Sequence, residues 1–132
     1  MTSDHEARVP GTAGIATLMA VGAGTLFVAS AIHFGIRVPL LVETVYDPFP
    51  GAAIPEAVIS AVLSVGAVAV AGWWPSTRGL AWGALAFALL GVVFGLSVTV
   101  PRGGGGDIGY HVLLLALLLF TAVRLSRASA RG

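Results

Sequence analysis

Four long apolar stretches separated by short polar segments dominate this chain. They cover about residues 12–34, 55–74, 79–100 and 109–125, and none has a charged residue at its centre. A helix needs about 20 apolar residues to cross the roughly 30 Å hydrocarbon core of a bilayer. In lipid, such spans must be helical because no water satisfies the backbone N–H and C=O groups. The pattern predicts an all-α, integral membrane four-helix bundle, with residues 1–132 as a single membrane domain.

The composition agrees with lipid as the surrounding solvent. The chain is 57% hydrophobic and 10% charged, whereas soluble domains are about one quarter charged. It has no cysteine, which excludes disulfides and thiolate-bound metals. A net charge of +1 offers no basic surface for nucleic acid, so we expect the bilayer and not nucleic acid as a partner.

Arginine counts in the short flanking segments predict the orientation. With the N-terminus in the cytoplasm, five arginines lie inside and two lie outside the membrane. The five inside are Arg8, Arg78, Arg124, Arg127 and Arg131, and the two outside are Arg37 and Arg102. We therefore expect a multi-pass protein of the inner (plasma) membrane with both termini cytoplasmic.

The first stretch has a second interpretation. Residues 29–31 read "ASA", an A-x-A pattern after an apolar run, which is typical of a signal peptidase site. Asp4 and Glu6 in the N-terminal region and the length of the apolar run argue against cleavage. Cleavage would remove the first helix of the predicted bundle.

Small residues recur at helical spacing and predict close helix packing, because lipid provides no hydrophobic drive for helix association. The stripes are Ala16, Ala20 and Gly24 on the first helix; Ala57, Ser60, Ser64, Ala67 and Ala71 on the second; and Gly79, Gly83, Gly91 and Gly95 on the third. The leucine-rich fourth helix is expected to face lipid over most of its surface. The same Gly/Ala/Ser faces suit contact with a membrane protein partner or with a second copy of the chain.

An outer loop of about residues 35–54 joins the first two helices. It is too polar to span a membrane, and Pro39, Pro48 and Pro50 preclude a long regular helix. The "YDPFPG" segment predicts successive turns. The loop is either a lid over an outward-facing pocket or a strap lying in the headgroup region, and the sequence leaves both open.

Three ionisable residues, His33, Glu56 and His111, fall near the outer ends of their predicted helices. Ionisable groups in or near a membrane are costly, so they are candidate site residues. Each has a structural alternative: Glu56 follows Pro55 at a predicted helix start, and His111 follows Asp107, a predicted N-cap, as an interfacial side chain. For His33 the alternative is a hydrogen bond to a neighbouring helix.

If these three side chains meet, several kinds of chemistry are open. Two imidazoles and a carboxylate suit a divalent transition metal, with Asp47 or Glu43 as a further ligand. A histidine beside Glu56 also suits proton exchange, as quinone or other redox chemistry requires. Glu56 alone suits general acid catalysis on a lipidic, isoprenoid-like substrate.

The layout resembles the DoxX-like family of small four-helix bacterial membrane proteins. The resemblance covers about residues 22–95 and rests on "HFG" at the end of the first helix, a proline-bearing loop, "IPEAVISAVLSVGAVAVAG", the turn "WWPSTRG" and "LAWGALAFALLG". It implies a membrane bundle with an accessory role in redox or quinone chemistry, and only Glu56 matches as a candidate residue. The segment "GGGGDIGYHVLLLALLL" lies outside the pattern, so His111 has no family support. A non-catalytic interaction or scaffold subunit is the alternative role.

Overall fold

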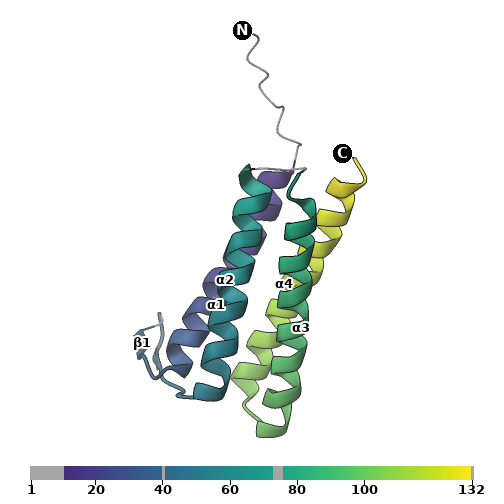
Figure 1. Ribbon diagram of the computed structural model, residues 1–132. Coiled ribbons are helices and arrows are strands. Elements are labelled where there is room, and N and C mark those ends of the chain that lie inside the picture. Colours follow the sequence, from purple (N-terminus) through teal and green to yellow (C-terminus); the bar gives the residue numbers. More distant parts are fainter. Residues whose placement is uncertain (1–10, 40, 73–75, 132) are drawn as a thin grey trace.

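The computed structural model is a bundle of four antiparallel helices, and it describes residues 11–39, 41–72 and 76–131 (Figure 1). The helices are α1 (Thr12–His33), α2 (Pro50–Gly72), α3 (Arg78–Arg102) and α4 (Gly105–Ser129). Each helix packs against the next along the chain, and α4 packs back against α1. The helices therefore form a closed ring around one core.

All four helices are long and apolar enough to cross a membrane. The most apolar window of each has a mean hydropathy of 2.0 to 2.2, and only 28% to 50% of the window is buried inside the bundle. Most of the remaining surface is aliphatic and aromatic, as the exposed Phe27, Leu90 and Leu113 illustrate. A surface of this kind suits lipid and not water, so the predicted all-α membrane bundle is confirmed.

The two ends of the bundle differ in what they carry. We call the end with the α1–α2 loop and the α3–α4 turn the hairpin end, and the opposite end the terminal end. The hairpin end is named after the β-hairpin in the α1–α2 loop, in which β1 (Val38–Pro39) and β2 (Thr44–Val45) pair antiparallel. The described chain begins and finishes at the terminal end, where the starts of α1 and α3 lie beside the ends of α2 and α4 (Figure 1).

The second helix begins five residues before the predicted start. Pro50 is its first residue and Pro55 lies inside it, so the interpretation of Glu56 as a helix-start residue was wrong. Proline is favoured at the first helical position, and of the two prolines it is Pro50 that takes this place. Pro55 removes only one early backbone bond, so the helix continues through it. Residues 73 and 74, the predicted end of this helix, lie outside the described part of the chain.

The fourth helix also starts earlier than the sequence pattern indicates, at Gly105 and not at residue 109. Gly104 precedes it as the N-cap, and Asp107 lies in the first turn. The predicted N-cap role of Asp107 was therefore wrong. α3 ends at Arg102, and Gly103, with a φ of 75°, terminates it. Of the four glycines of the turn, only Gly105 and Gly106 lie in α4.

Close packing uses only some of the predicted small-residue positions. Gly91 and Gly95 face inward, where a Cβ would clash with Ile59 and His111 respectively, whereas Gly79 and Gly83 have nothing within 4 Å. On α1 the core side chains are spaced so that Gly22, and not Gly24, faces Leu63. When a stretch is apolar on all sides, its sequence does not reveal how the helix is rotated about its own axis, and therefore which small residues face inward.

Two serines join α1 to α2 through the core. Ser30 Oγ donates to the carbonyl of Ala53 at 2.7 Å, and Ser60 Oγ donates to the carbonyl of Ala23 at 2.8 Å. In lipid, such bonds between helices contribute roughly 0.6 kcal/mol each on average. They fix the register of α1 on α2, and thereby the place where His33 meets α2.

Candidate functional site

The hairpin end holds a buried histidine–carboxylate pair that links two helices. His33 is the last residue of α1, and its Nδ1 lies 2.7 Å from Oε2 of Glu56 on α2. Both side chains are only 6% exposed. The backbone N–H of Phe49, just before α2, donates to the carbonyl of His33 at 2.9 Å. The predicted contact between His33 and a neighbouring helix is therefore present, and its partner is Glu56.

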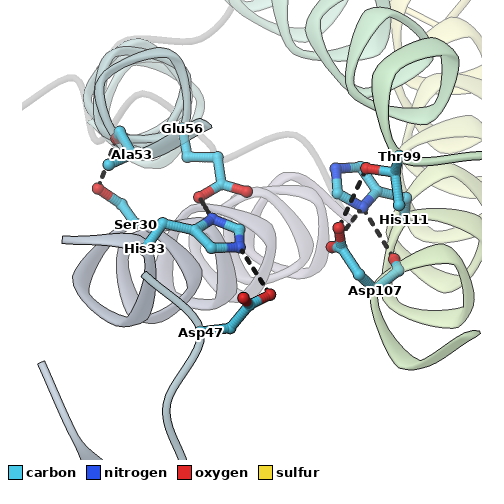
Figure 2. A network of polar contacts seen from close by, with 8 residues as sticks. All are labelled: Ser30, His33, Asp47, Ala53, Glu56, Thr99, Asp107 and His111. Carbon is cyan, nitrogen blue, oxygen red and sulfur yellow. Dashed lines mark hydrogen bonds and ion pairs between the residues drawn. The ribbon is translucent and has the colours of Figure 1, made fainter. Parts of the chain in front are cut away.

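A second carboxylate lies on the opposite edge of the same ring. Oδ2 of Asp47, in the loop before α2, is 3.9 Å from Nε2 of His33, and the Asp47 side chain is 56% exposed. Figure 2 shows the three groups in a row, from Asp47 through the imidazole to Glu56. This row runs from the surface of the protein to a buried carboxylate.

His111 does not join this row. Its Nδ1 lies 2.9 Å from the carbonyl oxygen of Asp107 and 3.1 Å from Oδ1 of the same residue, four positions earlier on α4. Thr99 Oγ1 on α3 donates to Oδ2 of Asp107 at 3.1 Å. The three predicted site residues thus share the hairpin end but belong to two separate pairs (Figure 2).

A small cavity lies between the two pairs. It has a volume of about 50 Å³, and Glu56 and His111 both line it together with the glycines of α3 at positions 91 and 95. The second oxygen of Glu56, Oε1, is buried and has no hydrogen-bond partner among the described residues. In Figure 2 this oxygen points away from His33, to the side on which His111 lies. A cavity of this size is large enough for a water molecule.

A much larger groove of about 680 Å³ opens on the other side of His33. One wall is the outward face of α1 from Val21 to Ile32, and the other is the start of α4 with Tyr110. Four ionisable side chains line its polar part: His33, Glu43, Asp47 and Asp107. The Tyr110 hydroxyl, close to Thr25, is buried without a hydrogen bond of good geometry within the described chain.

Phe49 closes the hairpin end between the site and Arg102. Its ring meets the His33 ring edge to face, with 6.0 Å between centroids. On its other side, Cζ of Arg102 lies 3.5 Å from the ring centroid. This cation–π contact ties the end of α3 to the start of α2, and so keeps the His33 ring packed.

The geometry does not favour a metal centre. Glu56 and Asp47 approach different nitrogens of His33, so the two carboxylates cannot share one ion with that ring. Across the described ranges, no group of three or more His, Asp or Glu side chains is arranged to hold a metal ion. The arrangement suits proton transfer along a row better than coordination of a divalent metal.

Several polar residues of the site were not singled out from the sequence. The Asp107–His111 pair has a spacing of four residues, which places both side chains on one helical face and was readable in advance. Thr99 and Ser30 carry no such spacing, because each donates a hydrogen bond to another helix. Comparisons of the chain with models of known protein families, with curated proteins and with solved structures gave no match.

Proposed function

We propose that this small integral membrane protein binds an amphipathic, lipid-soluble molecule in the groove beside α1 and exchanges a proton with its polar head through His33. The observation that carries the proposal is the position of His33 at the polar end of an otherwise apolar groove. A volume of about 680 Å³ falls within the usual range of small-molecule sites, roughly 300 to 1,000 Å³.

The pair with Glu56 gives His33 a defined orientation. When the Glu56 carboxylate is ionised it can only accept a hydrogen bond, and in that state Nδ1 of His33 carries the proton and donates it to Oε2 of Glu56. Nε2 is then the nitrogen that takes or gives a proton, and it is on the side of Asp47 and the groove. A base held in place by a carboxylate is a recurrent arrangement in proton-transfer sites. Glu56 is thus a positioning residue and His33 the proton-exchanging residue.

The apolar part of the groove suits a hydrocarbon tail. From Val21 to His33 the wall of α1 extends for about 18 Å at 1.5 Å per residue. Val28 and Ile32 lie along it, and Val28 is half-exposed. A quinone matches both parts, because its tail is apolar and its ring oxygens accept hydrogen bonds and take up protons once a redox partner has supplied electrons. An isoprenoid alcohol matches them nearly as well.

The proposal extends to the cellular role of the protein and to its orientation in the membrane. An accessory or redox-linked role of the DoxX-like kind is consistent with a proton-exchanging site, although the family itself stays a prediction. A position in the inner membrane with both termini in the cytoplasm is supported by four arginines at the terminal end. Asp47 and the groove would then face outward.

A second role, as a scaffold or oligomer contact, rests on one specific observation. Gly79 and Gly83 lie one turn apart on the outer face of α3, with nothing within 4 Å. Small residues at this spacing let a second helix approach closely. The partner is then another membrane helix or a second copy of the chain.

Binding of a decyl-substituted benzoquinone to the purified full-length chain in nanodiscs tests the first role. Val28→Trp fills the groove, and we expect it to weaken binding at least about tenfold, the equivalent of about 1.4 kcal/mol. The matched control is Val93→Trp, which places the same side chain on an exposed position of α3 outside the groove, and it should leave the affinity unchanged. His33→Gln should weaken binding by a similar factor, because it removes the ionisable partner of the head. Equal affinities for all four proteins would contradict the groove and favour the scaffold role.

A further inference from the structure

The terminal end of the bundle contains a third pocket, remote from the site above. It has a volume of about 170 Å³ and lies between the first turn of α1 and the last turns of α4. Ile15 of α1 and its N-cap Gly11 line one side, and Arg124 and Arg127 of α4 line the other together with Arg131, just beyond the end of α4. The volume is several times the roughly 30 Å³ that a water molecule occupies in the liquid.

Among the residues that the structure describes, the charge around this pocket is unbalanced. Arg124 and Arg127 lie three positions apart on one face of α4, and Arg131 follows just beyond the end of the helix. All four carboxylates of the described chain, Glu43, Asp47, Glu56 and Asp107, belong to the hairpin end. The ion pairs found within residues 11–39, 41–72 and 76–131 all involve histidine, so none of these arginines is neutralised there.

The neighbouring helix adds positive potential. α1 begins at this pocket, and a helix start carries a partial positive charge from its backbone N–H groups. Its N-cap, Gly11, provides no side-chain cap, and the first turn contains no acidic residue. Nη2 of Arg124 lies 3.9 Å from the point that a Cβ on Gly11 would occupy, so the guanidinium is held against this helix start.

The dipole of α4 accounts for part of this arrangement only. Cations are stabilised at the last turn of a helix, which explains why arginines follow one another on α4. It does not explain why they line a cavity that also faces the positive end of α1. Two sources of positive charge around one cavity are characteristic of an anion site.

We propose that this pocket binds a phosphate group, either of an anionic lipid headgroup or free in solution. Guanidinium groups bind phosphate through paired N–H donors, and basic pockets between membrane helices recognise lipid headgroups. Arg124 and Arg127 provide these donors, and the start of α1 contributes its dipole. The site is independent of the groove at the hairpin end.

Native mass spectrometry of the full-length chain in mild detergent tests the proposal. In detergent, the orientation of the chain in a membrane does not affect access to the pocket. One arm titrates phosphatidylglycerol against phosphatidylcholine, and a second titrates inorganic phosphate. We expect phosphatidylglycerol to bind about tenfold more tightly than phosphatidylcholine. The double variant Arg124→Gln/Arg127→Gln should abolish this preference, and Arg124→Lys should reduce it in part, since lysine keeps the charge without the planar fork.

The matched control is Arg78→Gln. Arg78 lies at the same end and its Nη1 donates to the Ser129 carbonyl at 3.4 Å, but it does not line the pocket. It should retain the lipid preference. Tight binding of inorganic phosphate with the same dependence on Arg124 and Arg127 would support the site and identify free phosphate as its ligand. An equal loss of the lipid preference in Arg78→Gln and in the double variant would overturn the proposal. So would a wild-type chain that neither prefers phosphatidylglycerol over phosphatidylcholine nor binds inorganic phosphate.

Discussion

The two histidine–carboxylate pairs of the hairpin end are similar in chemistry but different in construction. His33 and Glu56 are 23 positions apart in sequence and join α1 to α2, whereas Asp107 and His111 share one face of α4. The first pair lies between a groove and a small cavity, and one oxygen of Glu56 is left without a partner. The second pair is anchored by a backbone carbonyl and by Thr99.

This difference helps to distinguish a functional site from a purely structural contact in a membrane bundle. A pair within one helix exists as soon as the helix forms, and it needs no further partner. A pair between helices depends on the whole bundle, and its buried free oxygen has a cost unless something binds there. The His33–Glu56 pair is therefore the better candidate for function, and the three predictions below test the contrast.

Removal of Glu56 should have the largest effect on stability. Glu56→Ala leaves the His33 ring buried without its partner, and we expect the free energy of unfolding to fall by about 3 kcal/mol. Glu56→Gln keeps an acceptor for Nδ1, so it should cost only about 1 kcal/mol. Steric trapping in bicelles measures both values. Equal costs for the two variants would show that packing, and not the hydrogen bond, holds this junction.

The architecture of the bundle was readable from the sequence, but the pairing of its side chains was not. Hydropathy gives the four spans, and the spans place His33, Glu56 and His111 at one end. The rotation of each helix about its own axis decides which of them meet, and it is set by packing contacts such as Met19 against Gly66. Spans that are apolar on all sides carry no periodic pattern from which to read that rotation.

Helix boundaries show the same limit. Two prolines, Pro50 and Pro55, each offer a plausible helix start, and the backbone of Phe49 decides between them by accepting bonds from Ala52 and Ala53. By contrast, the spacing of Asp107 and His111 was sufficient to predict their contact, because it depends on one helix alone. This local contact could have been inferred from spacing, although the N-cap role predicted for Asp107 was wrong, whereas contacts between helices required the structure.

The packing of α3 against His111 provides the second test. A Cβ on Gly95 would lie 2.6 Å from Nε2 of His111, so Gly95→Ala must displace the ring or part the two helices. We expect a loss of about 2 kcal/mol, as for overpacked cores. Gly83→Ala is the control, since it adds the same methyl group to the same helix in open space, and it should raise stability by up to about 1 kcal/mol. A neutral Gly95→Ala would mean that the ring of His111 is free to move.

Removal of the Asp107 carboxylate should have the smallest effect of the three. Asp107→Ala loses the contact of Oδ1 with Nδ1 of His111 and the bond from Thr99, but Nδ1 keeps the Asp107 backbone carbonyl at 2.9 Å. Since His111 retains a partner, we expect a cost of about 1 kcal/mol, measured by the same trapping assay as for Glu56→Ala. A cost as large as that of Glu56→Ala would contradict the contrast, because it would make the pair within one helix as dependent on its carboxylate as the pair between helices.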